Sequence, residues 1–229
     1  MNKLANPSAA ELATQPVERR IPLAVKIGFT AFMAVLVPVY WVNYGPTNFL
    51  YFCDVALFLT LAAVWTESAL LASMAAVGIV LPQLVWVADF VAGLGGVKLL
   101  GMTAYMFDEK RSLFLRGLSL FHGWLPFLLI FLVKRLGYDK RAFPAWWTLA
   151  WALILFCFTF MPGPTPNPGA EPVNINYVHG MSDTEAQSWM PPLAWLATLM
   201  AGLPALPYFP THLALKRWCA PAGREVAVA

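Results

Sequence analysis

Residues 69–91 read ALLASMAAVGIVLPQLVWVADFV, a run in which Asp89 is the only charged side chain. An α-helix needs about 20 mainly apolar residues to cross a bilayer. Similar runs recur along the chain, so the sequence predicts an all-α integral membrane protein, a bundle of six transmembrane helices. The predicted spans are about 22–42, 47–66, 69–91, 113–135, 143–162 and 191–213. Pro204, Pro207 and Pro210 are expected to kink or break the sixth.

The composition excludes a water-soluble domain of this size. Of the 229 residues, 59% are hydrophobic and 12% are charged, whereas typical soluble domains have roughly 25% charged residues. The net charge of +3 is too small to indicate nucleic-acid binding. Cys53, Cys157 and Cys219 have the spacing of neither a zinc site nor a disulfide framework. We expect one membrane domain over residues 21–215, polar tails at 1–20 and 216–229, no metal and no cofactor.

The basic residues indicate the orientation of the bundle. With the N-terminus inside, eleven of the 15 lysines and arginines are cytoplasmic and four are external, as the positive-inside rule requires. Both termini are therefore expected in the cytoplasm, with the chain in a bacterial-type cytoplasmic (inner) membrane. No small-residue cleavage site follows the first run, which favours a retained helix over a signal peptide. The aromatic residues expected in interfacial belts are Tyr40, Trp41, Tyr44, Trp146 and Trp147.

Polar side chains inside the predicted spans are candidate functional groups, because burying ionisable groups in a bilayer is costly. They are Asn48, Cys53, Asp54, Gln83, Asp89 and His122. At 1.5 Å per residue, Cys53, Gln83 and His122 lie roughly 9, 12 and 13 Å from the outer ends of their helices. Three helices are thus expected to bring polar groups to one level in the outer leaflet.

Structural interpretations stand beside these functional ones. A cysteine in a buried helix is usually a small apolar residue, and a histidine or carboxylate in a span often bonds a neighbouring helix. Asp89 is close enough to the interface to be solvated, and Lys26 to extend to the inner headgroups. His212 is expected to be interfacial.

The predicted external loop, 163–190, is too rich in proline and glycine for a helix. Its composition fits an exposed linker. Apolar residues nevertheless alternate with asparagine from Val173 to Val178, and His179 follows, so the segment also fits a lid over the outer mouth of the bundle. Both interpretations stay open at this point.

Three short segments resemble motifs of one family. Residues 48–61, NFLYFCDVALFLTL, resemble the His-Leu-Cys-Asp second-helix motif of the YwaF-type bacterial integral membrane proteins. Phe121-His122-Gly123 resembles that family's Ser-His-Gly helix, and Asn176-Tyr177 its Thr-Asn-Tyr segment. The motifs follow in the family's order between about residues 47 and 213, and the resemblance implies a compact six-helix fold.

The resemblance also implies a chemistry. Vertebrate relatives of the family include a phospholipid acyltransferase that uses a cysteine and a histidine, and more distant relatives are the androgen-induced hydrolases of fatty acid esters. Carried onto this chain, Cys53 would be the nucleophile and His122 its base. Tyr51 stands where the family has histidine and Phe121 where it has serine, so an activating or orienting group of the family is missing.

The sequence thus predicts a lipid acyltransferase or lipid ester hydrolase in the outer leaflet, with membrane lipids as its partners. Cys53 and His122 would be catalytic, and Asp54 would orient the imidazole. The predicted substrate-binding residues are Asn48, Tyr51, Gln83, Asn176 and Tyr177. The alternatives are a transporter or channel with Asp54 and His122 lining a polar pathway, and a non-catalytic scaffold subunit.

Overall fold

The computed structural model describes residues 21–169 and 171–219. The tail expected at 1–20, and the other expected tail from residue 220 onward, lie outside these residues. The described chain is helical and contains no strand. Its elements are α2 (Leu23–Tyr44), η1 (Pro46–Leu50), α3 (Phe52–Thr66), α4 (Ala69–Leu94), η2 (Ala104–Phe107), α5 (Leu113–Ser119), α6 (Phe121–Leu136), α7 (Ala142–Phe160), η3 (Ile175–Tyr177), α8 (Pro192–Leu203), η4 (Pro204–Tyr208) and α9 (Phe209–Trp218).

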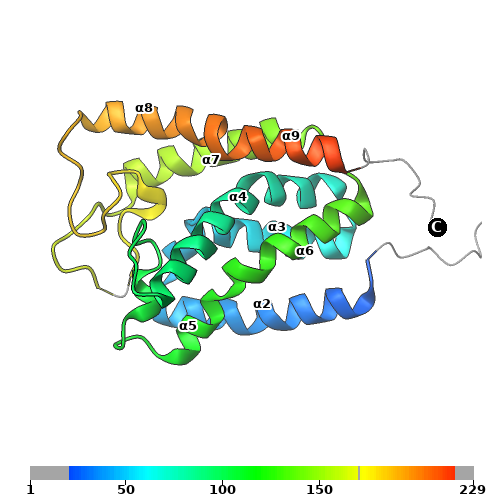
Figure 1. The fold of residues 1–229 in the computed structure, drawn as a ribbon, viewed down its shortest axis with the longest axis horizontal. Helices are drawn as coiled ribbons and strands as arrows, with labels where there is room; N and C mark the ends of the chain where they lie inside the picture. Colours follow the sequence, from blue (N-terminus) through cyan, green and yellow to red (C-terminus); the bar gives the residue numbers. More distant parts are fainter. Residues whose placement is uncertain (1–20, 170, 220–229) are drawn as a thin grey trace, which may run out of the picture.

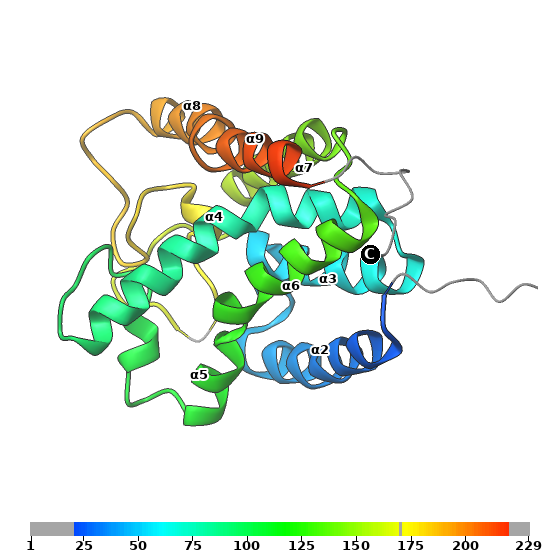
Figure 2. The same ribbon diagram turned by 45° about the vertical axis from the view of Figure 1, so that its right-hand side comes forward.

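The long helices run side by side along the long axis of the molecule (Figure 1). Helix α4 is central, since it packs most extensively against α6 and α3 and also contacts α7 and α9. Helix α2 flanks one side of the bundle, and α8 and α9 flank the other (Figures 1 and 2). Segments 95–112 and 161–191 gather at one end, here called the loop end. The opposite end, where α2 begins and α9 ends, is called the tail end.

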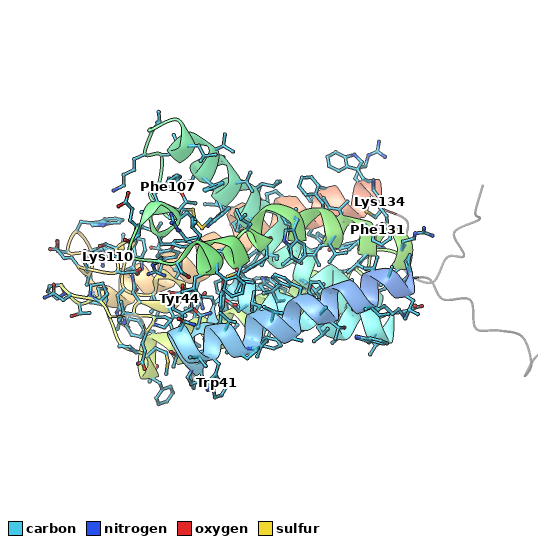
Figure 3. The ribbon with its side chains drawn as sticks, turned by 90° about the horizontal axis from the view of Figure 1, so that it is seen from below. Trp41, Tyr44, Phe107, Lys110, Phe131 and Lys134 are labelled. Carbon is cyan, nitrogen blue, oxygen red and sulfur yellow. The ribbon has the colours of Figure 1, made fainter. Side chains whose placement is uncertain are left out.

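Five helical segments in the described chain are long and apolar enough to cross a membrane. They are Leu23–Tyr44, Ala69–Leu94, Leu113–Leu136, Ala142–Phe160 and Pro192–Trp218. Many large apolar side chains point outward, including Val42 at 83% exposure, and Figure 3 shows Trp41 directed away from the bundle. Such a surface suits a hydrocarbon environment, because soluble proteins rarely expose large contiguous apolar patches.

The second predicted span differs from the rest. Residues 46–50 form a 3₁₀ turn that begins at Pro46, so α3 begins at Phe52 and not near residue 47. With 15 residues, α3 rises only about 22 Å, which is less than the roughly 30 Å of bilayer hydrocarbon. Six full-length spans are therefore not present as α-helices in the described chain.

The last helical segment continues through its three prolines. Pro204, Pro207 and Pro210 were expected to kink or break the sixth span, because proline removes a helical N–H donor. The regular α-helix is indeed interrupted there, by a π-helical turn over Pro204–Tyr208, and the chain goes on as α9 to Trp218. A π turn is a known way for a helix to absorb an irregularity of this kind. The helix extends past residue 213, where the sequence placed its end.

A glycine at the centre of α4 admits the largest buried side chain. Trp146 of α7 is fully buried and occupies the space where a Cβ on Gly78 would lie. The rings of Phe52 and Tyr208 each meet the Trp146 indole edge-on, with centroids 6.1 Å away. The expectation that Trp146 belongs to an interfacial belt is wrong, because the indole packs inward between helices.

Lys26 is buried and paired and does not extend toward headgroups as expected. Its side chain is 7% exposed, and Nζ lies 2.8 Å from Oε1 of Glu67. The same Glu67 oxygen accepts the N–H of Ile21 at 3.2 Å. This contact joins the start of α2 to the turn between α3 and α4. The two residues are 41 positions apart in the sequence, so the depth of Lys26 in the membrane does not reveal its partner.

Candidate functional site

The long segment between α7 and α8 folds over the loop end of the bundle. Ile175 and Val178 are at most 1% exposed and pack with Ile154, Cys157 and Leu196 of α7 and α8. The alternation of apolar residues and asparagine noted in the sequence therefore has a structural role, since the apolar side chains of the loop are buried. The lid interpretation of this segment is favoured over the linker.

Asn176 attaches this loop to the first turn of α3. Its Oδ1 accepts the N–H of Phe52 at 3.1 Å, and its Nδ2 donates to the carbonyl of Leu50 at 2.9 Å. The first N–H groups of a helix have no partner within the helix, so Asn176 acts as a cap supplied from a distant part of the chain. Because both ends of the amide are engaged, Asn176 acts as a positioning residue, and its predicted role in substrate binding stays a prediction.

Asn174 shapes the loop around this cap. Its Nδ2 donates to the carbonyls of Gly180 and Ser182, and its Oδ1 accepts the N–H of His179 at 2.8 Å. Asn174, Asn176 and Tyr177 all have positive φ, a region that asparagine tolerates better than most residues. Tyr177, predicted to bind substrate, is half-buried, and its carbonyl accepts the indole N–H of Trp195 at 2.9 Å.

The second loop, 95–112, is held by Asp89. Oδ1 accepts the N–H groups of Leu100 and Gly101 at 2.7 and 3.1 Å. Oδ2 accepts the N–H and the hydroxyl of Thr103 at 2.9 and 2.7 Å. Asp89 is only 3% exposed, so the expectation that water solvates it is wrong. Backbone donors of the loop take the place of solvent.

The two loops approach each other across the loop end. The guanidinium of Arg111 lies 5.6 Å from the ring centroids of both Tyr44 and Tyr105, and it donates to the Tyr44 hydroxyl at 3.2 Å. In the other loop, burial raises the pKa of Asp183, and the nearby Arg111 charge acts in the opposite direction. Lys110 also lies at this end of the molecule (Figure 3).

His122 lies near the start of α6 in a cluster of aromatic and hydroxyl groups. Its Nδ1 is 2.7 Å from the carbonyl of Ser119, and its ring stacks on Trp86 with centroids 4.8 Å apart. A carbonyl can only accept a hydrogen bond. Nδ1 therefore carries the proton, and Nε2 keeps the lone pair that a proton acceptor needs.

Tyr40 and Tyr105 complete this cluster. The Tyr40 hydroxyl lies 2.9 Å from Oγ of Ser119, and Tyr40 is 4% exposed, so its expected place in an interfacial belt is wrong. Burial raises the pKa of Tyr105, while the neighbouring side chains of Ser119 and Trp86 lower it. The loop thus positions Tyr105 near Trp86 of α4 and Ser119 of α5.

Cys53 and Asp54 form a second polar group, in the first turn of α3. The thiol of Cys53 donates to Oδ2 of Asp54 at 3.5 Å, a long contact. The loop residue Tyr177 is close by. Burial is the main cause that raises the pKa of Tyr177 to about 12, and Asp183 and Cys53 add smaller contributions in the same direction. Cys53 likewise raises the pKa of Tyr105. One tyrosine from each loop thus lies near the thiol, and the Cys53 side chain is itself partly exposed.

The predicted pairing of Cys53 with His122 stays a prediction. Both residues lie toward the loop end, and Tyr105 is near both Cys53 and Ser119, the residue that His122 contacts. Among the residues described, however, no hydrogen bond joins the thiol to the imidazole. The direct partner of the thiol is Asp54.

The remaining predicted residues differ in burial and in hydrogen bonding. Asn48 is 8% exposed, and its carbonyl accepts the N–H of Tyr51 at 3.2 Å. Tyr51 precedes α3 and is half-buried. Gln83 is 2% exposed, and neither its Oε1 nor its Nε2 has a hydrogen-bond partner within residues 21–169 and 171–219.

Two surface pockets lie in the loops. One, of about 260 Å³, is lined by Asp89 and the segment around Gly93–Phe107. Another, of about 450 Å³, is lined by residues between Met181 and Trp195. Neither of these two pockets includes Cys53 or His122, although the Cys53 side chain is partly exposed.

Comparison with known proteins does not identify a family for this chain. A search of protein families, of curated proteins and of solved structures finds no significant match to this chain. The candidate site therefore rests on its own geometry.

Three residues of the cluster were not expected to belong to it: Ser119, Trp86 and Tyr105. Ser119 and Trp86 had a signal in the sequence. Ser119 lies one helical turn before His122, and Trp86 one turn after Gln83, and such spacings place side chains on one helix face. Tyr105 had no such signal in the sequence, because its position depends on the loop conformation that the hydrogen bonds of Asp89 stabilise.

Proposed function

We propose that this protein is a membrane-embedded lipid acyltransferase or lipid ester hydrolase with Cys53 as its nucleophile. The observation that carries the proposal is a partly exposed thiol in contact with a buried carboxylate at the loop end of the bundle. An imidazole with an unprotonated Nε2 lies toward the same end. A nucleophile next to a proton acceptor is the usual arrangement for covalent acyl transfer.

The reaction proceeds in two halves. The Cys53 proton passes to Asp54, because only the thiolate is an effective nucleophile. The sulfur attacks the ester carbonyl, the C–O bond to the alcohol breaks, and the alcohol leaves with the proton from Asp54. The acyl group stays on Cys53 as a thioester until water or a second alcohol accepts it. His122 supplies a further proton acceptor through Nε2 once a loop has moved.

The proposal puts this chemistry near one membrane surface. In the proposed topology the chain crosses a cytoplasmic membrane six times, with 46–66 as the short second crossing, and both termini are cytoplasmic. The loop end then faces the exterior, where the ester bonds of outer-leaflet lipids lie just below the headgroups. In this proposal the lipid reaches the partly exposed thiol beside loops 95–112 and 161–191.

A transport pathway is less well supported by the packing. Toward the tail end the interior is apolar, with Val64, Leu129 and Leu132 completely buried. Two polar side chains there are already bonded: the Thr60 hydroxyl to its own helix, and Ser73 Oγ to the N–H of Asp139. A cation passing Asp54 would meet a close-packed apolar region.

Lipid mass spectrometry of expressing cells tests the proposal. Wild type is expected to change the cellular pool of lipid esters relative to cells without the protein, and Cys53→Ala is expected to leave that pool unchanged. Cys219→Ala, a partly exposed cysteine at the tail end, is the matched control and should act like wild type. If Cys53→Ala alters lipids as fully as wild type does, Cys53 is not the nucleophile.

A further inference from the structure

Two buried polar side chains on neighbouring helices have atoms that the described residues do not satisfy. They are Oδ1 of Asp54 and both amide atoms of Gln83. Asp54 is 3% and Gln83 2% exposed. Buried polar groups in folded proteins nearly always have a partner, and ordered water is the usual one where the protein supplies none. These three atoms therefore point to a small polar molecule.

The hairpin formed by α3 and α4 brings the two residues to one level. The helices are antiparallel, pack directly on each other, and are joined by a short turn at Glu67 and Ser68. Asp54 lies 12 residues before the end of α3, about 18 Å from the turn, and Gln83 lies 14 residues after the start of α4, about 21 Å from it. Both side chains are buried in the bundle at this level.

The hydrogen-bond donors and acceptors of Asp54 and Gln83 match those of a water molecule. The Gln83 amide can donate through Nε2 and accept through Oε1, and a carboxylate only accepts. Water can donate to Asp54 while it exchanges a second hydrogen bond with Gln83. A fatty acyl chain offers no hydrogen-bonding group, so it cannot satisfy these atoms.

We propose that Asp54 and Gln83 hold the water molecule that removes the acyl group from Cys53, so that the protein is a hydrolase. This rests on the proposed function, because it requires an acyl group on the neighbouring residue. The water oxygen attacks the thioester carbonyl, and its proton passes to Asp54. The C–S bond breaks, the free fatty acid leaves, and the thiolate of Cys53 takes the proton from Asp54.

The ratio of two products tests this role of Gln83. Purified protein is incubated with p-nitrophenyl decanoate and excess glycerol, and decanoic acid and glycerol decanoate are both measured. Wild type is expected to give mainly acid. Gln83→Met removes the amide at nearly constant volume, and it should shift the acid-to-ester ratio toward glycerol ester by about 10-fold, the scale of one hydrogen bond that positions the attacking water. Spontaneous hydrolysis of the ester is measured without protein and subtracted. The remaining products come only from folded molecules, so partial unfolding does not alter their ratio.

Thr60→Val is the matched control, since Thr60 is a fully buried polar residue of α3 whose hydroxyl bonds its own helix. It should leave the ratio as in wild type. If Gln83→Met does not fold, Gln83→Asn, which retracts the amide, should shift the ratio in the same direction. An unchanged ratio, or glycerol ester as the main wild-type product, contradicts the hydrolase assignment but leaves Cys53 as nucleophile. Absence of both products from wild type overturns the proposed function and this inference with it.

Discussion

Asn176→Ala is expected to lower the free energy of unfolding by roughly 2–4 kcal/mol, because it leaves buried backbone groups at Leu50 and Phe52 without their partner. The same substitution releases the 161–191 loop from α3. Thermal unfolding in detergent measures the first effect. The rate at which a protease cuts the loop measures the second, and cleavage should become faster while the rest of the chain stays protected.

Asn43→Ala is the control for this change. Asn43 is exposed, and its side chain bonds the carbonyl of Val39 within its own helix. Its substitution should alter stability by no more than about 0.5 kcal/mol. If Asn176→Ala matches Asn43→Ala in both stability and loop protection, the loop is not attached to α3 by this side chain.

Gly78→Ala is expected to have the largest effect on folding. A Cβ at this position would lie 1.9 Å from Cε2 of Trp146. The indole has little room to retreat, because it is completely buried and has Phe52 and Tyr208 as neighbours. Overpacking a well-filled core typically costs 1–3 kcal/mol and occasionally more, so we expect a loss of about 3 kcal/mol or more. Thermal unfolding of the purified protein checks this value.

Gly28→Ala is the matched control in α2. Nothing in the described chain lies within 4 Å of a Cβ placed there. A glycine-to-alanine change inside an unobstructed helix usually stabilises it by roughly 0.5–1 kcal/mol. Opposite signs for the two substitutions are therefore expected. Equal stability of Gly78→Ala and Gly28→Ala would mean that Trp146 does not occupy the groove beside α4.

The sequence predicts the helices of this fold well, because crossing a bilayer requires long apolar runs and few sequences satisfy that by accident. Residues 69–91 lie within α4 as predicted. Hydropathy could not separate η1 from α3, since both are apolar and only the backbone turn at Pro46 distinguishes them. Proline content led to an expected interruption near Pro204, where the backbone uses a π turn and continues.

Side-chain positions were less predictable, because depth in the membrane does not determine which way a residue faces. Lys26, Tyr40 and Trp146 have the depths expected of interfacial residues, yet each faces inward to a partner distant in sequence: Glu67, Ser119 and Gly78. The same limit applies to Cys53 and His122. Their common end of the bundle could be predicted, whereas their contacts depend on helix rotation and on loops whose folds follow from Asp89, Asn174 and Asn176.

The most direct test of the account is to locate the acyl group during turnover. Wild-type protein is incubated with p-nitrophenyl decanoate, quenched in acid and digested, and the peptides are analysed by mass spectrometry. The account predicts a decanoyl group on Cys53 that hydroxylamine removes, with Cys157 and Cys219 unmodified. A decanoyl group on a different residue, or product formation with no acylated peptide, would contradict the assignment of Cys53 as the nucleophile.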